Sequence, residues 1–258
     1  VIVASSRSIY GEGKYESPEH GIQYPSSRKE EDLKNSQFDC LCPISNKPMK
    51  ELPTSEDSII HPISTYGLTK YFQENILQST CEALSIPMIA LRFQNVYGVG
   101  QSLNNPYTGI ISIFSNQFKK NKSINIFEDG KESRDFVYIS DVVDAIEKSI
   151  DYNLNKRLIL NIGSGVKTSV IEIATILKAN LKSKSEIIIT GEFRKGDIRH
   201  NYADLTKAKD ILNFNPKINI NDGLKLFCNW MIKQKTSEDL NNSYKNSLLE
   251  LKEKNLLS

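Results

Sequence analysis

Apolar and polar residues follow two distinct patterns along the chain. Short runs rich in β-branched residues, each ending in polar residues or glycine, are typical of strands buried in a sheet. Longer segments with apolar residues three or four positions apart are typical of helices that cover such a sheet. The strand-like runs lie at residues 1–5, 87–93, 123–130, 134–139, 158–165 and 185–190.

The predicted helices lie between these runs. The longest begins at Ser64 and places Phe72, Ile76 and Leu77 at helical spacing. Ser140 or Asp141 could cap a second helix that follows residues 134–139. Because strands and helices alternate regularly, we expect an α/β fold with a parallel sheet of βα units. The remaining predicted helices cover residues 109–119, 170–181, 204–212 and 221–234.

Two segments lack either pattern. Residues 11–62 are polar and carry six of the nine prolines, so we expect a long irregular excursion, which is typical of functional lids or disordered segments. The tail from Ser237 onward is rich in Lys, Asn and Glu and only weakly amphipathic. We expect it to form a loosely held helix or to be disordered.

Composition narrows the choice of partners and compartment. A net charge of +2 is too small to favour a nucleic-acid or membrane-surface partner, and the apolar runs are far shorter than the roughly 20 residues of a membrane span. Four cysteines in 258 residues do not make a disulfide framework, so we expect a reducing cytoplasm. Cys40 and Cys42 are the only close pair, and a zinc site usually needs a C-x-x-C and a second pair. We therefore expect no metal.

The strongest local candidate for chemistry is the pair Tyr66 and Lys70 in "STYGLTK". Positions i and i+4 of a helix share one face, so the phenol and the ammonium can lie side by side. A neighbouring cation favours the phenolate form, which would serve as a general base near neutral pH. The alternative is an ordinary surface pair, because Y-x-x-x-K occurs often by chance.

Ser5 and Ser6 are the second candidate, because they directly follow the first strand-like run. In open parallel sheets, ligands gather at the carboxyl ends of the strands, where a hydroxyl can bond a substrate oxygen. The alternative is that these hydroxyls bond only the local backbone.

These features occur in a specific order. "SSRSIYG" is followed by the Y-x-x-x-K helix, then by "LRFQNVYG", "RDFVYISDVVDAI" and "LNIGSG". In this order the sequence resembles the extended short-chain dehydrogenases/reductases, and among them the NAD-dependent nucleotide-sugar epimerases and dehydratases. The resemblance runs from Val1 to about Leu226. It implies the C-terminal part of a Rossmann-like parallel sheet with a smaller α/β substrate-binding lobe.

The resemblance also implies that a glycine-rich cofactor-binding half is missing. No G-x-x-G-x-x-G turn follows a strand, and the similar "NIGSGVKTS" occupies the place of a structural turn in the family. A dinucleotide-binding βαβ unit needs about 30 residues, so we expect the chain to be a fragment that lacks this half.

By the same resemblance the chain divides into five segments. Residues 1–98 would form a partial NAD-binding Rossmann domain with a long insert at 12–62, and 99–133 a segment of the substrate lobe. Residues 134–165 would return to the Rossmann domain. A C-terminal substrate-binding lobe at 166–236 and a polar tail at 237–258 would follow.

The family pattern assigns the catalytic roles to three residues. Ser6 matches the residue that holds the reacting sugar hydroxyl, Tyr66 matches the base, and Lys70 matches the residue that supports the phenolate and binds the nicotinamide ribose of NAD. The implied mechanism is removal of the sugar O4 proton by Tyr66 while hydride passes to NAD. The 4-keto sugar then turns, and hydride returns to its other face.

Five further residues match the family's binding site for a nucleotide-diphosphate sugar. Asn95 matches a residue near the diphosphate, and Arg134 and Arg194 match arginines that grip it, a role that suits the bidentate geometry of a guanidinium. Asn125 and Phe127 match the edge of the nucleotide base pocket. The alternatives are surface ion pairs for the arginines and a core position for Phe127.

The residues after Ser6 limit the reaction type. Family dehydratases carry an Asp-Glu pair where this chain has Arg7 and Ser8, which do not readily supply the acid and base of an elimination, so we do not expect dehydration. The glutamate that the family's decarboxylases place here is also missing. "NVYGVGQSLNNPYTGIISIFS" and "GDIRHNYADLTKAKDIL" are similar to a subgroup that epimerises dTDP-L-rhamnose at C4. That subgroup carries a C-P-x-C-like element where this chain has "CLCPISN".

We therefore expect an NAD-dependent nucleotide-sugar 4-epimerase that acts on a dTDP-deoxyhexose and, as the family suggests, forms a homodimer. One alternative is a nucleotide-sugar 4-ketoreductase or dehydrogenase, which would use the same Ser-Tyr-Lys set. The other is a non-catalytic remnant that only binds nucleotide.

Overall fold

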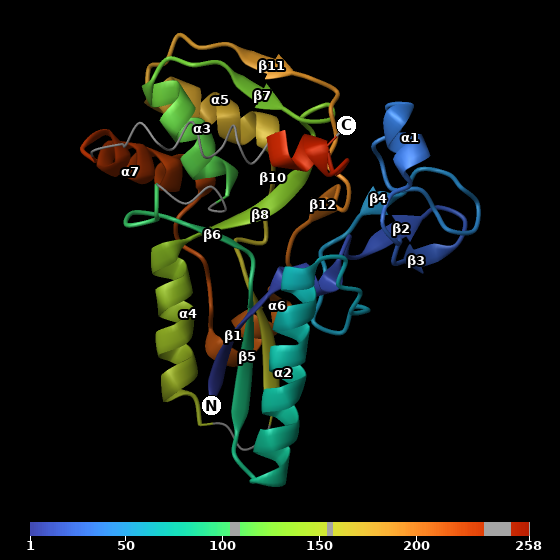
Figure 1. Ribbon diagram of the computed structural model, residues 1–258. Helices are drawn as coiled ribbons and strands as arrows, with labels where there is room; N and C mark the ends of the chain where they lie inside the picture. Colours follow the sequence, from blue (N-terminus) through green and yellow to red (C-terminus); the bar gives the residue numbers. More distant parts are fainter. Residues whose placement is uncertain (104–108, 154–156, 235–248, 258) are drawn as a thin grey trace.

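The computed structural model describes residues 1–103, 109–153, 157–234 and 249–257. The molecule is elongated, with a parallel sheet at one end, a second α/β layer at the other and a smaller lobe beside them (Figure 1). The expected α/β class is confirmed, because the long strands pair in parallel and helices cover them.

Three parallel strands form the central sheet in the order β1-β5-β9. The side chains of Leu91 and Leu160 in its core are fully buried. Because both faces of such a sheet are covered, its strands are mostly apolar, as residues 87–91 and 158–160 are. The strands are β1 (Ile2–Ser6), β5 (Met88–Phe93) and β9 (Arg157–Ile162).

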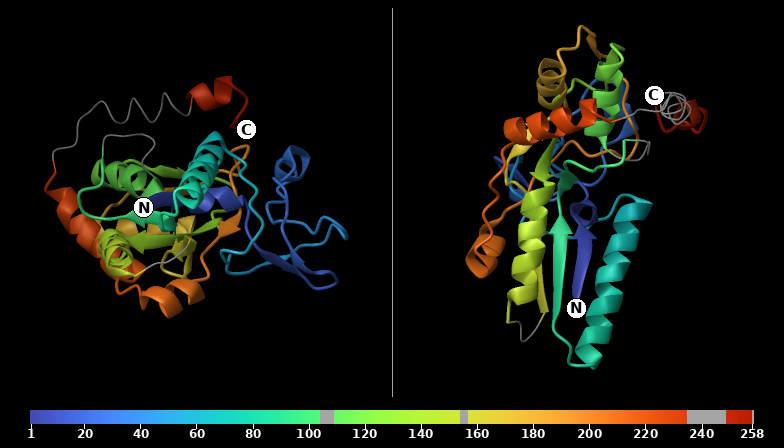
Figure 2. Two further views of the ribbon diagram at one scale, coloured as in Figure 1. Left: turned by 90° about the horizontal axis from the view of Figure 1, so that it is seen from below. Right: turned by 90° about the vertical axis from the view of Figure 1, so that its left-hand side faces the viewer.

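Helices cover both faces of this sheet (Figure 2, right). On one face, Cys81 of the long helix packs against Val3 and Ala90. On the other face, Val142 and Ala145 pack into a second apolar cluster with the strands. The first face is covered by α2 (Thr65–Ala83), and the second by α4 (Ile139–Asp151) and α6 (Thr206–Leu212).

A second sheet continues the fold beyond the carboxyl ends of the central strands. Its middle strand is β8 (Ser133–Tyr138), which is buried along its whole length. It pairs in parallel with β6 (Asn95–Tyr97) and β12 (His200–Asn201), and antiparallel with β10 (Lys167–Ser169).

The far end of the molecule has its own apolar core, which includes Phe118, Ile173 and Phe227. Helices α3 (Ile110–Lys119), α5 (Val170–Asn180) and α7 (Ile220–Ile232) supply most of it. Two short parallel strands, β7 (Ile124–Ile126) and β11 (Ile187–Ile189), lie beside these helices (Figure 1).

The insert is more regular than the sequence indicated. Its strands form a sheet in the order β3-β2-β4, over a small core of Tyr15, Cys40, Cys42 and Met49. These strands are too short to show a two-residue period, so the sequence did not predict them, while most of residues 11–62 lie outside helices and strands, as expected. The elements are β2 (Tyr15–Ser17), β3 (Gly21–Gln23), α1 (Glu30–Lys34) and β4 (Lys50–Glu51).

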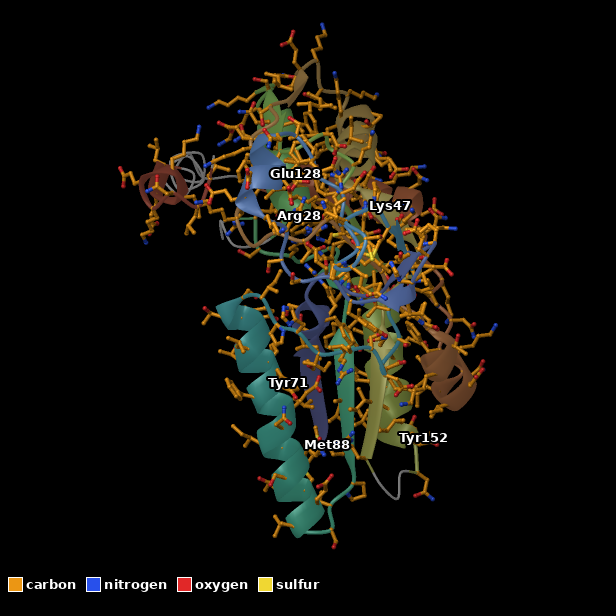
Figure 3. All side chains as sticks on the ribbon, turned by 90° about the vertical axis from the view of Figure 1, so that its right-hand side faces the viewer. Arg28, Lys47, Tyr71, Met88, Glu128 and Tyr152 are labelled. Carbon is orange, nitrogen blue, oxygen red and sulfur yellow. The ribbon has the colours of Figure 1, made fainter. Side chains whose placement is uncertain are left out.

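A buried ion pair joins the insert to the end of β7. Arg28 donates two hydrogen bonds to the carboxylate of Glu128, each 2.8 Å long, and both residues are labelled in Figure 3. Glu12, at the start of the insert, lies 3.5 Å from the Nε of Arg28. The insert is therefore held against the body by charges that few water molecules can screen.

The predicted cap of α4 is wrong. The helix begins one residue before Ser140, with Tyr138 at the cap position and no side-chain cap bond. Asp141 instead accepts backbone hydrogen bonds from Lys217 and Ile218, at 3.1 Å each. Its carboxylate thus ties α4 to the segment that leads into α7.

The tail lies partly outside the described residues. Residues 249–253 are helical, Leu257 is buried, and the Lys195 N–H donates to the carbonyl of Leu256 over 2.9 Å. The four cysteines are buried and free. Among the described residues, no helix has the length and apolar character needed to cross a membrane.

Candidate active site

Ser6 stands at the carboxyl end of β1 and caps the short 3₁₀ helix η1 (Arg7–Tyr10). Its Oγ accepts hydrogen bonds from the Ser8 backbone N–H at 3.2 Å and from the Ser8 Oγ at 2.9 Å. The local backbone bond that the sequence left open therefore exists. A hydroxyl that accepts two bonds keeps its own proton for an external acceptor.

Helix α2 brings Tyr66 to the same place. Ser64 caps the helix by accepting the Gly67 N–H at 3.0 Å, which sets the start of α2 next to η1. A Cβ at Gly67 would lie 2.6 Å from the carbonyl oxygen of Ser8, so only glycine permits this approach. The Tyr66 side chain, directly before this contact, is 56% exposed.

Lys70 lies one turn further along α2. Its Nζ donates to the carbonyl of Ala4 at 3.0 Å and to Gln73 Oε1 at 3.2 Å, and it lies 6.0 Å from the centroid of the Tyr66 ring. The phenol and the ammonium are therefore neighbours, as the helical spacing predicted.

A buried network fixes the sheet beneath these residues. Arg92 of β5 forms a bidentate pair with Glu74 of α2, at 3.0 and 2.9 Å, and also donates to the hydroxyl of Tyr10 at 2.7 Å. That hydroxyl donates to Asn161 of β9 at 2.8 Å. One chain of bonds thus connects α2, η1 and two of the central strands, β5 and β9.

A pocket of about 470 Å³ opens at the carboxyl ends of β1 and β5. Ser6 and Tyr66 line it, and so do Asn95 and Arg194 from the predicted binding set. Four of the eight site residues predicted from the sequence therefore line one cavity. The full lining is Ser6, Arg7, Ser8, Gly11, Ile63, Ser64, Tyr66, Gln94, Asn95, Arg194, Lys195, Gly196, Asp197 and Ile198.

Arg134 lies behind the pocket wall. Its two terminal nitrogens donate to the carbonyls of Ser133, Ile198 and Arg199 at 2.9, 2.7 and 3.1 Å, and to Asp197 Oδ1 at 2.7 Å. These four bonds use all the terminal N–H groups of the guanidinium. Arg134 thus holds the pocket-lining segment around Asp197, and its direct contact with a diphosphate stays a prediction.

The other two predicted binding residues lie on the far lobe. Asn125 is exposed on β7, where it is paired in register with Ile188, and Phe127 directly follows that strand and is half-buried. Neither lines the pocket around Ser6. Their place at a nucleotide base stays a prediction.

Two pocket residues had no sequence signal. Arg7 lines the cavity directly after Ser6, where the sequence only excluded dehydration. Gln94 is 4% exposed, and both atoms of its side-chain amide lack a partner among the described residues. Whether a side chain finds a partner depends on the tertiary structure, so neither residue stands out in the sequence.

The turn "NIGSG" has a structural role next to the pocket. The fully buried carboxylate of Asp135 accepts bonds from the Ser164 N–H and Oγ, the Gly165 N–H and the Ala203 N–H, at 2.7 to 3.2 Å. Burial raises the pKa of Asp135, while these donors oppose the rise. A Cβ at Gly163 would lie 2.4 Å from Asp135 and 2.7 Å from Gln94, so glycine is needed where β9 ends.

Comparison with known proteins agrees with this arrangement. A model of the NAD dependent epimerase/dehydratase family matches residues 39–163. The chain is also 36% identical over 235 residues to dTDP-L-rhamnose 4-epimerase of Burkholderia thailandensis, across 91% of this chain and 63% of that protein. Residues 39–163 therefore carry the signature of an NAD dependent epimerase/dehydratase domain.

Two solved structures share the fold of this chain. UDP-glucose 4-epimerase of Thermotoga maritima, solved with UDP-glucose, superposes with a TM-score of 0.70 at 30% identity, over 90% of this chain and 63% of that one. MoeE5, solved with UDP-glucuronic acid and NAD, gives 0.69 at 27% identity, over 90% and 64%. The chain spans about 63% of the length of the Burkholderia dTDP-L-rhamnose 4-epimerase.

The chain also has an acidic cluster outside the pocket. The carboxylates of Glu128, Asp129 and Glu132 lie within 4.8 Å of one another. The buried guanidinium of Arg199 lies among them, 3.0 Å from Glu128, 2.7 Å from Asp129 and 3.9 Å from Glu132. The positive charge that these carboxylates need is therefore supplied by an arginine.

Proposed function

We propose that this chain carries the catalytic and sugar-binding residues of an NAD-dependent nucleotide-sugar 4-epimerase. The observation that carries the proposal is the convergence of Ser6 and Tyr66 on one pocket at the carboxyl ends of β1 and β5, with Lys70 one turn further along α2 and hydrogen-bonded to β1. Parallel α/β sheets bind ligands at this edge.

In the proposed reaction Tyr66 is the general base and later the general acid. Its phenolate takes the proton of the sugar O4 as the C4–H bond breaks, and the phenol returns that proton when the C4–H bond forms again on the other face. Ser6 donates to the same oxygen and holds it in place. The cation of Lys70 beside the ring favours the phenolate form.

The residues present fit NAD at the same edge of the sheet. Lys70 uses two of its three N–H donors on Ala4 and Gln73, which leaves one for a ribose hydroxyl. When bound, NAD would accept the hydride from C4 and give it back within each turnover. The MoeE5 structure, which contains NAD, supports this choice of cofactor.

The substrate we propose is a dTDP-deoxyhexose such as dTDP-L-rhamnose. The 36% identity to dTDP-L-rhamnose 4-epimerase supports it, while the structural similarity to a UDP-glucose 4-epimerase supports the wider class of nucleotide sugars. Arg194 and Asn95 line the pocket where a diphosphate would bind. The five segments expected from the sequence, with borders at 98, 133, 165 and 236, remain part of this proposal.

We also propose a homodimer built on the outer face of α2. Leu68, Phe72 and Ile76 follow one another at four-residue spacing and are 41%, 57% and 65% exposed. Such a stripe packs well against the same helix of a second copy. Sedimentation of the wild type and of Phe72→Glu tests this association.

Substitution of Tyr66 tests the catalytic proposal. In the native polypeptide, Tyr66→Phe should abolish turnover of a nucleotide sugar in the presence of NAD and leave its binding nearly unchanged, because only the proton-transferring hydroxyl is lost. Tyr71→Phe is the matched control, since Tyr71 is on the same helix but not in the pocket (Figure 3). Unchanged turnover in Tyr66→Phe would overturn the mechanism.

The 4-ketoreductase alternative uses the same three residues and differs in its stoichiometry. A reductase consumes one reduced cofactor for each product, whereas an epimerase interconverts two sugars without net consumption. A protein that binds nucleotide sugar but converts none under either condition would be the non-catalytic remnant.

A further inference from the structure

The buried arginines of this protein are consistently paired with carboxylates. Removal of a guanidinium from water is costly unless it gains a counter-charge and hydrogen bonds, so this pairing is expected. The pairs are Arg28 with Glu128, Arg92 with Glu74, Arg134 with Asp197, and Arg199 with Asp129.

Arg7 departs from this pattern. It is partly buried and lines the pocket beside Ser6, yet within the described part of the chain its guanidinium makes no hydrogen bond or ion pair. Burial and the nearby charge of Arg134 lower its pKa to about 10, with Asp197, Glu12 and Tyr66 opposing this effect. Arg7 therefore keeps its positive charge at neutral pH and has unused donors.

The neighbouring Arg134 has no unused terminal N–H group to offer to a ligand in the pocket. Its terminal nitrogens are occupied by three carbonyls and by Asp197. Arg194 lines the same pocket from the opposite segment. Arg7 and Arg194 are thus the guanidiniums that this cavity presents from its lining.

We propose that Arg7 binds an oxyanion of the substrate and is a specificity-determining residue of the pocket. The inference rests on the proposed function and deepens it. The oxyanion is either the diphosphate of the nucleotide or a carboxylate on the sugar, since both present two oxygens to the fork of a guanidinium. Because Arg7 is bonded to Ser6 in sequence, this contact also sets the distance between the anion and the hydroxyl that holds the sugar.

Binding measurements on Arg7→Met distinguish the diphosphate from a sugar carboxylate as the oxyanion that Arg7 binds. Calorimetry would use three ligands, each in its UDP and dTDP form: the nucleoside diphosphate, its glucose ester and its glucuronate ester. Loss of a charge-assisted bond should weaken the affected ligands about 10- to 100-fold. An equal loss for all three identifies the diphosphate, and a loss for the glucuronate ester alone identifies a sugar carboxylate.

A second readout distinguishes binding from a structural role. An arginine that stabilises the fold would lower the melting temperature when removed, but an unpaired, partly buried one should leave it unchanged or raise it. Arg157→Met is the control, because Arg157 is exposed at the opposite end of the central sheet. Arg7→Lys retains the charge and should recover part of the affinity.

The outcomes separate the two proposals. If the wild type binds these ligands and Arg7→Met binds all of them equally well, the role of Arg7 is overturned while the proposed function stands. If Arg7→Met melts several degrees lower than Arg157→Met, the side chain is structural and the inference is also overturned. If the wild type binds none of the ligands, the proposed function itself fails.

Discussion

The Nζ of Lys70 donates a hydrogen bond to the carbonyl of Ala4, at 3.0 Å. This bond joins α2 to β1 two residues before Ser6, so the helix that carries Tyr66 and the strand that carries Ser6 are fixed relative to each other. Lys70 thereby acts twice, through its charge near Tyr66 and through its bond to the strand.

Lys70→Met tests the first of these actions. The variant keeps most of the side-chain volume and removes the cation, so we expect kcat to fall by about 10²-fold or more, the range of a weakened general base. Gln73→Met removes only the second acceptor of the ammonium and should leave kcat nearly unchanged. Steady-state turnover of both variants provides the comparison, and equal kcat values would contradict the role of Lys70.

Gly67→Ala tests the contact between α2 and η1. The added Cβ would lie 2.6 Å from the Ser8 carbonyl oxygen, which is backbone and cannot turn away, so the two elements must separate. We expect kcat to fall at least ~10-fold, because small displacements of reacting groups are costly. At Gly109 an added Cβ has open space, so Gly109→Ala is the control. Activity equal to that of the control would show that this contact does not position Tyr66.

Gln94→Met should make the protein more stable. Both amide atoms of Gln94 are buried without a partner among the described residues, and an apolar side chain of similar size removes that penalty. We expect a gain of about 1 kcal/mol, or roughly 2–4 °C in melting temperature. Gln78→Met, on the exposed side of α2, should give no such gain. A lower melting temperature for Gln94→Met would mean that the amide is satisfied in solution.

The stability of the protein should depend on the ionisation of Glu132. Burial raises the pKa of Glu132 from 4.5 to about 7, so the folded protein holds a proton that the unfolded chain releases between these values. Stability should therefore fall as pH rises through this window, by no more than about 3 kcal/mol. His200 acts in the opposite direction, because burial lowers its pKa to about 4 and its protonation opposes folding.

Comparison of the wild type with Glu132→Gln isolates the carboxylate. The contribution of His200 is common to both proteins, so their difference in unfolding free energy should grow from pH 5 to pH 7.5 in favour of the variant. Glu16→Gln, at an exposed position, should show no such trend. A constant difference across the titration would contradict the raised pKa.

The sequence predicted the central sheet well, because the burial of both its faces leaves apolar runs such as residues 87–91. The sequence also predicted that Tyr66 and Lys70 are neighbours on one helix face, because helical periodicity is a local property. It did not predict the strands of the insert, which span only two or three residues each. It also misplaced the cap of α4, because Asp141 bonds a segment more than 70 residues away.

Around the pocket, the sequence indicated which residues belong to the site but not which groups they hydrogen-bond. Arg134 was expected at the diphosphate because of its place in "SRDF", but its terminal N–H groups are taken by carbonyls and a carboxylate from 63 to 65 residues further on, and by the carbonyl of Ser133. The unpaired state of Arg7 could not be predicted for the same reason. Partners that are distant in sequence leave no periodic signal.

The most direct test of the epimerase proposal follows the hydrogen at C4 of the sugar. The native polypeptide would be incubated with NAD and dTDP-L-rhamnose deuterated at C4, and the products analysed by NMR and mass spectrometry. We predict a mixture of the two C4 epimers that both retain the deuterium, with no net formation of NADH. One-way conversion with stoichiometric use of cofactor, or no conversion of any nucleotide sugar, would contradict it.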